Sequence, residues 1–232
     1  MPSTKKSLHF LSSALLTAIS IGVMGYCMST QWAETTMDCT KSGDNFSNGT
    51  AVITWELFIG DLNRFYCPLF GAQESFQVIP TLVKIGQITP VVLHALVLCL
   101  LALCLLCSAC SILISLYNSV SNPYETYMGP VGFYVCSSLS ACLSVVVLII
   151  FVVNVTVTSM AEDLVKSSSE NIPAELRNKS SQMKLGYYLV ILYSVLSIFA
   201  IVVIYQYEHA AYTQKREQQR PTEDAPKEIM MY

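Results

Sequence analysis

The chain has 232 residues, a formal net charge of -3, 53% hydrophobic residues and only 12% charged residues. In ordinary soluble domains about a quarter of the residues are charged, so this composition excludes an ordinary soluble protein. The small net charge also gives no electrostatic basis for binding nucleic acid. The few charges gather between long uncharged stretches, which is how a multi-pass membrane protein distributes polarity.

Four stretches contain no Asp, Glu, Lys or Arg, and each is long enough to cross a bilayer. They predict membrane spans at residues 8–29, 91–117, 131–157 and 185–205. A hydrocarbon core about 30 Å thick needs about 20 apolar residues. Lys5 and Lys6 before the first stretch would also fit a secretory signal, but the apolar run is too long and lacks a clean cleavage site. We therefore predict an all-α membrane protein, a four-helix transmembrane bundle.

The segments between the spans predict the orientation of the chain. We expect a cytosolic N-terminus (1–7), a first extracellular loop (30–90), a cytosolic loop (118–130), a second extracellular loop (158–184) and a cytosolic tail (206–232). The Lys/Arg bias between the two sides is small, so glycosylation sequons carry this prediction. Asn45, Asn48 and Asn178 lie in the two extracellular loops, and acceptors must face the secretory lumen. A further sequon at Asn154 lies within a span and is rejected. Both termini are predicted to be cytosolic, and the protein is predicted to lie in the plasma membrane.

The first extracellular loop is large enough to fold by itself. Thr50–Ile59 and Phe76–Ile85 are rich in β-branched and aromatic residues, which is typical of strands. They predict a small extracellular β-sheet above the helices. Cys39 and Cys67 lie well inside this loop, where the compartment is oxidising, and they are predicted to form a disulfide. The alternative is that both are free thiols, and Cys27, at the outer end of the first span, is a possible competing partner.

The second extracellular loop looks different in composition. Ser167–Ser169 and Pro173 predict a polar, mobile segment, and Glu162–Lys166 is expected to extend the third helix. Within the third span, Ser137 with Ala141 and Ser140 with Ser144 recur at four-residue spacing. Small residues at this spacing let helices approach closely, either inside the bundle or against other membrane proteins.

The remaining cysteines and the histidines give no catalytic pattern. Cys104-x-x-Cys107-x-x-Cys110 resembles a metal or redox motif, but in a lipid-embedded helix without nearby carboxylates we interpret it as packing. Cys110 and Cys136, in the cytosolic half, are candidate palmitoylation sites. The three histidines, His9, His94 and His209, lie at separate helix ends. We predict no catalytic residue, no cofactor and no metal, and therefore no enzyme.

The chain ends in Met230-Met231-Tyr232, whose free carboxylate and apolar side chains fit a PDZ-domain groove. A disordered tail without a partner is the alternative. The predicted partners are therefore the lipid bilayer, other membrane proteins through helix packing, and a PDZ or actin-linked scaffold at the C-terminus.

Several short motifs together resemble those of one known protein family. They are Tyr117-Asn118, Pro123, Glu125-Thr126, Gly129-Pro130, Gly132 and Tyr134 around the cytosolic loop, Leu57-Phe58-x-Gly60, Trp32, Trp55, Met1-Pro2 and Met231-Tyr232. With these motifs the chain resembles the clarin family, four-span relatives of the claudins and stargazins. The stretches Ser119–Tyr124 and Gln218–Pro221 are most similar to the third paralogue of that family. Glu56 departs from the family pattern, which has Gly there.

The resemblance implies a claudin-like fold and a role without catalysis. Such a protein is expected to organise membrane complexes or to link them to junctions or actin, in hair cells or other sensory or epithelial cells. The alternative function is an auxiliary subunit of a channel, or an oligomer that itself forms a pore.

Overall fold

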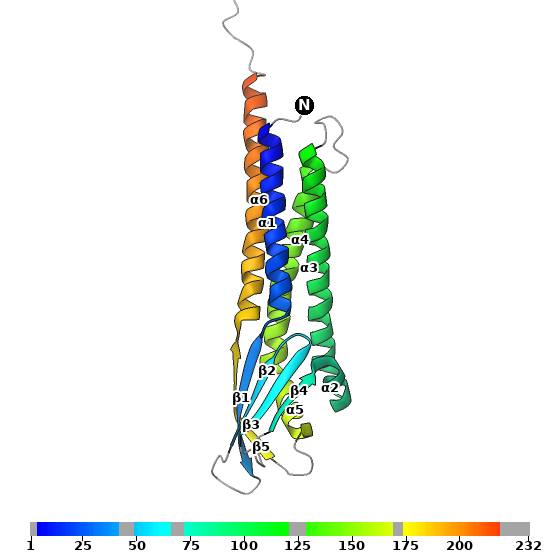
Figure 1. Cartoon of the computed structure of the whole chain (residues 1–232), viewed down its shortest axis with the longest axis vertical. Coiled ribbons are helices and arrows are strands. Elements are labelled where there is room, and N and C mark those ends of the chain that lie inside the picture. The colour runs from blue at the N-terminus through cyan, green and yellow to red at the C-terminus, as the bar shows by residue number, and fades with distance from the viewer. Residues whose placement is uncertain (1–3, 42–48, 66–71, 121–128, 169–173, 219–232) are drawn as a thin grey trace, which may run out of the picture.

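The structure is a computed structural model that describes residues 4–41, 49–65, 72–120, 129–168 and 174–218. Four long helices form a bundle, and a small sheet lies at one end of it (Figure 1). The helices are α1 (Thr4–Met28), α3 (Ile88–Val120), α4 (Pro130–Val157) and α6 (Leu185–Gln218). All four are long and apolar enough to cross a membrane. The predicted fold class is confirmed.

The four helices form a ring in which each packs against two neighbours. α1 and α4 each pack against both α3 and α6. The pairs α1 with α4 and α3 with α6 therefore lie on the diagonals. Each helix overlaps one predicted span, but α6 continues past residue 205 to Gln218 and rises beyond the start of α1 (Figure 1). Its last turns are rich in Ala, Gln, Glu, Lys and Arg, which are strong helix formers in water.

The sheet has five antiparallel strands in the order β4-β3-β2-β1-β5. They are β1 (Ala33–Lys41), β2 (Gly49–Trp55), β3 (Ile59–Phe65), β4 (Ala72–Gln77) and β5 (Ala174–Met183). The predicted strand Thr50–Ile59 falls largely on β2. The predicted strand Phe76–Ile85 is wrong, because most of it forms the helix α2 (Val78–Ile85). Val78 and Leu82 are both buried, and four-residue spacing places them on one helix face.

The second loop contributes to the sheet, which was predicted from the first loop alone. β5 pairs with β1 from Ala33↔Met183 to Lys41↔Ala174, so the sheet draws on both loops rather than on the first alone. The expected extension of the third helix is also wrong. α4 ends at Val157, and α5 (Met160–Ser168) begins as a separate helix after an extended Thr158. Pairing with β1 decides the structure of β5, because strand propensity depends strongly on tertiary context.

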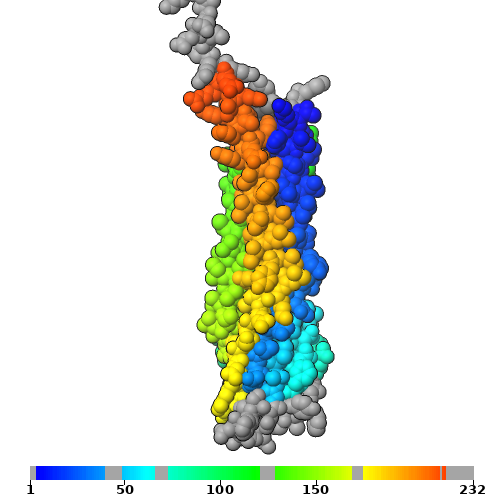
Figure 2. All heavy atoms as spheres, turned by 90° about the vertical axis from the view of Figure 1, so that its left-hand side faces the viewer, coloured from blue at the N-terminus to red at the C-terminus, as the bar shows by residue number. Residues whose placement is uncertain are grey.

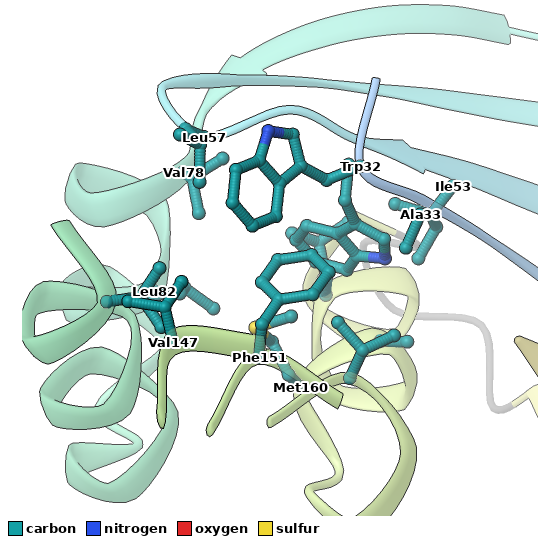
Figure 3. Packing of buried hydrophobic residues seen from close by; sticks show 14 of the residues in the cluster. Trp32, Ala33, Ile53, Leu57, Val78, Leu82, Val147, Phe151 and Met160 are labelled. Carbon is teal, nitrogen blue, oxygen red and sulfur yellow. The ribbon is translucent and has the colours of Figure 1, made fainter. Parts of the chain in front are cut away.

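One hydrophobic core joins the sheet to the bundle. It runs from Ile53 and Trp55 of the sheet through Trp32 to Phe151 and Tyr193 of the helices. Figure 3 shows the part of this core around Trp32 and Phe151. Figure 2 shows the face of α6, which continues without a break into the strands at its lower end. Sheet and bundle are therefore one packed unit. A smaller cluster at the other end contains Phe10, Phe133, Ala200 and Ile204.

Candidate functional site

The interior of the bundle contains hydrogen bonds between serines of different helices. Ser137 of α4 donates to Ser111 Oγ of α3 at 3.0 Å, and Ser144 Oγ of α4 lies 2.7 Å from Ser194 Oγ of α6. All four side chains are buried. In lipid, such a bond contributes about 0.6 to 2 kcal/mol to helix association. The predicted seam of small residues on α4 therefore faces the bundle.

Serine hydroxyls also join the helix α1 to both of its neighbours, here through bonds to backbone carbonyl oxygens. Ser115 of α3 donates to the carbonyl oxygen of Phe10 at 2.7 Å, and Ser13 of α1 donates to that of Ala200 at 3.2 Å. Ser13 and Ser115 were not predicted as contact residues. The signal was present, since Ser108, Ser111 and Ser115 recur on one face of α3 at spacings of three and four residues.

Tyr193 of α6 crosses the centre of the bundle. Its side chain is fully buried, and its hydroxyl donates to the Cys104 carbonyl oxygen at 3.2 Å. The same hydroxyl lies 2.6 Å from Ser108 Oγ. Because α3 and α6 lie on a diagonal, this ring occupies the space between all four helices. The axis of a single bundle is therefore filled with protein at this level.

Trp32 connects the sheet to three helices. Its indole Nε1 donates to the Cys27 carbonyl oxygen at the end of α1, and its ring lies edge-on to Phe151 of α4 with centroids 4.9 Å apart. Its backbone N–H donates to Trp55 of β2 at 2.8 Å. The start of α6 is equally close, since a Cβ on Gly186 would lie 2.5 Å from Trp32 Cδ1. This residue fixes where the sheet sits.

The hairpin between β2 and β3 is held by a histidine of α3. His94 is buried, and its Nε2 lies 2.8 Å from the Leu57 carbonyl oxygen at the hairpin tip. A carbonyl only accepts, so Nε2 carries the proton. Gly60 lies directly over Phe76, where a Cβ would stand 2.5 Å from the ring. Among the described residues, positive φ is found at Asn178 and Gly86. Glu56 is not one of them, so a glutamate where the family pattern has Gly requires no strained backbone.

The structure describes only some of the predicted disulfide, glycosylation and C-terminal binding residues. Cys39 is disulfide-bonded and Cys27 is a free thiol, while Cys67 lies outside the described residues. Its pairing with Cys39 stays a prediction. Asn178 is exposed at a bulge of β5, and its Nδ2 donates to Asp38 Oδ2 at 2.9 Å. Asn45, Asn48, Met230, Met231 and Tyr232 also fall outside the described residues.

The remaining candidates are spread over the helices. Cys110 is exposed on α3 and Cys136 is half-buried on α4. His9 lies beside Tyr207 and His209 stacks on Tyr205, both far from His94 along the bundle. Among the residues that the structure describes, no group of three or more His, Cys, Asp or Glu side chains is arranged to hold a metal ion.

Comparison with known proteins agrees with this architecture. A family model described as Clarin-2-like matches residues 4–204. Clarin-3 of Mus musculus is 34% identical over 239 residues, and Clarin-3 of Rattus norvegicus is 36% identical over 242, each match covering all of both chains. Clarin-1 of Homo sapiens is 26% identical over 172 residues, 71% of this chain and 72% of its own. The chain belongs to the clarin family of claudin-like, four-span membrane proteins.

Proposed function

We propose that this protein organises other proteins laterally in the plasma membrane and acts without catalysis. In this proposal the protein crosses the membrane at residues 8–29, 91–117, 131–157 and 185–205. An even number of spans puts both termini on one side, which we propose to be the cytosol, and the tail there would bind a PDZ or actin-linked scaffold. The observation that carries the proposal is the single core running from the sheet into the bundle. Because sheet and helices form one packed unit, a partner held by the sheet and another held by the helices keep a fixed geometry. Sensory hair cells or epithelial cells, which maintain ordered membrane complexes, are the proposed setting.

The second candidate is an auxiliary subunit of a channel. Many large apolar side chains, including Leu106, Ile149 and Phe199, are exposed on the bundle surface and are free to pack against other spans. A pore through one bundle is disfavoured, because Tyr193 fills the axis and the spans lack the Asp, Glu, Lys and Arg side chains that usually mark ion paths. A pore formed by this protein would have to lie between copies.

Two measurements test the proposal together. The full-length protein is purified and reconstituted into liposomes loaded with an ion-sensitive dye, and proximity labelling from the tail is carried out in expressing cells. We expect no ion flux into the liposomes and a reproducible set of labelled membrane and scaffold proteins. A chain truncated before Met230 serves as the control for PDZ-dependent labelling. Ion flux from the purified protein alone would establish the pore and reject the organiser.

A further inference from the structure

The tip of the β2–β3 hairpin lies at the depth of a membrane boundary. α3 has 33 residues, and its midpoint is Cys104. His94 precedes Cys104 by ten residues, which places it about 15 Å from the midpoint, or half of a hydrocarbon core about 30 Å thick. His94 Nε2 lies 2.8 Å from the Leu57 carbonyl oxygen. The hairpin tip therefore reaches the level where acyl chains meet lipid headgroups.

The helix α4 independently places the same end of the sheet against the hydrocarbon core. Phe151 lies about 11 Å from the midpoint of α4, well within the half-thickness of a hydrocarbon core. The Trp32 ring contacts Phe151 at 4.9 Å, and the Trp32 N–H donates to the Trp55 carbonyl oxygen at 2.8 Å. Trp55 directly precedes the hairpin tip. Two helices thus place the same end of the sheet at the membrane.

Both carbonyl oxygens at the tip have protein partners. The Phe58 carbonyl oxygen accepts from the Val78 N–H at 3.0 Å, and His94 supplies the partner of the Leu57 carbonyl oxygen. The Glu56 N–H donates to the Ile59 carbonyl oxygen at 3.0 Å. Non-helical backbone at membrane depth requires such internal partners, because little water is available there. These bonds therefore favour a tip that lies at the membrane.

Phe58, at this tip, is a large apolar side chain that the protein leaves 54% exposed. We propose that Phe58 inserts between the phospholipids of the outer leaflet and anchors the hairpin at the boundary of headgroups and acyl chains. The lipid-facing surface of α3 continues to this level, since Val92 and Leu96 beside His94 are also exposed. Partly buried apolar side chains at this boundary stabilise membrane association. The inference rests on the membrane spans of the proposed function.

Three phenylalanines with nearly equal exposure make a matched test. Phe58 is 54% exposed, Phe65 at the other end of β3 is 57% exposed, and Phe199 in the span of α6 is 58% exposed. Each is replaced in turn by p-benzoylphenylalanine in the full chain, which is reconstituted in phosphatidylcholine vesicles carrying an alkyne on one acyl chain. Irradiation then links the probe to whatever it touches, and the alkyne reports lipid adducts. Melting temperatures of the three variants check that each is folded.

We expect the lipid adduct at Phe58 to approach that at Phe199 and to exceed that at Phe65 several-fold. A Phe58 yield equal to that of Phe65 would overturn the inference. A crosslinked dimer or an adduct with another protein at Phe58, in place of lipid, would also overturn it. Absence of lipid adducts at Phe199 would instead reject the span itself, and with it the proposed function, so the two failures are distinguishable.

Discussion

Gly186 lies against the indole of Trp32 so closely that a Cβ at this position would stand 2.5 Å from Cδ1 and 2.7 Å from Nε1. The first turn of α6 and the start of the sheet therefore meet at a point that admits only glycine. The contact is completed by the Gly186 N–H, which donates to the Gln31 carbonyl oxygen at 2.8 Å. This point joins the two parts of the protein.

Gly186→Ala is expected to destabilise the protein by about 1 to 3 kcal/mol, because overpacking displaces either Trp32 or the helix. The measurement is the thermal midpoint of unfolding in detergent micelles. Gly22→Ala in α1 is the matched control, since nothing lies within 4 Å of a Cβ built there. Equal midpoints for the two variants would show that the protein accommodates a Cβ at position 186 at no cost in stability.

Tyr193→Phe tests the hydrogen bonds across the bundle centre. The change removes the hydroxyl that bonds Ser108 and Cys104 but keeps the ring, and we expect a loss of about 0.6 to 2 kcal/mol. Tyr188→Phe is the control, because that ring is exposed on the same helix. The fraction folded is followed by circular dichroism during titration with a denaturing detergent. If Tyr188→Phe destabilises as much, the cross-bundle bonds are not the cause.

Charge-free length predicts the four helices, because only helices and closed barrels satisfy a lipid-exposed backbone, and runs of about 20 residues or more fit a helix whereas a barrel strand needs only about 10. Composition fails for β5, whose sequence AELRNKSSQM looks like a polar loop and becomes a strand only because β1 offers an edge. It fails for α2 for the opposite reason: β-branched residues predict a strand, while burial of Val78 and Leu82 on one face favours a helix. Contacts between distant segments, such as that of Trp32 with Gly186, leave no local pattern to read.

His94→Leu is expected to release the hairpin tip, because the Leu57 carbonyl oxygen loses its side-chain donor. An unpaired buried acceptor costs about 1 to 3 kcal/mol. Hydrogen exchange of the backbone amides from Trp55 to Gly60 should therefore become faster. His94→Gln retains a donor and should restore part of the protection, while His209→Leu, at an exposed position, should leave the hairpin unchanged. Unchanged exchange in His94→Leu would remove His94 from this role.

Palmitoylation at Cys110 and Cys136 is testable with one matched cysteine. Both lie in the half of the bundle that we assign to the cytosolic leaflet, whereas Cys142, also exposed on α4, lies nearer the midplane. We expect hydroxylamine-sensitive acyl exchange to disappear when Cys110→Ala and Cys136→Ala are combined, and to persist in Cys142→Ala. Labelling that persists in the double variant would place any acyl group elsewhere.

The disulfide of Cys39 gives the last prediction. Cys67→Ser should leave Cys39 as a free thiol that reacts with a maleimide-polyethylene glycol, whereas Cys27→Ser should leave Cys39 unreactive, because Cys27 is a free thiol in the structure. Breaking a bridge that closes a loop of this length removes about 3 to 4 kcal/mol. The loss should concentrate in the sheet, since Cys39 belongs to β1 and the helices are held by their own interior bonds. The gel shift is read after denaturation without reductant. If Cys39 instead reacts in Cys27→Ser and not in Cys67→Ser, its partner is Cys27, and the first loop must follow a different path.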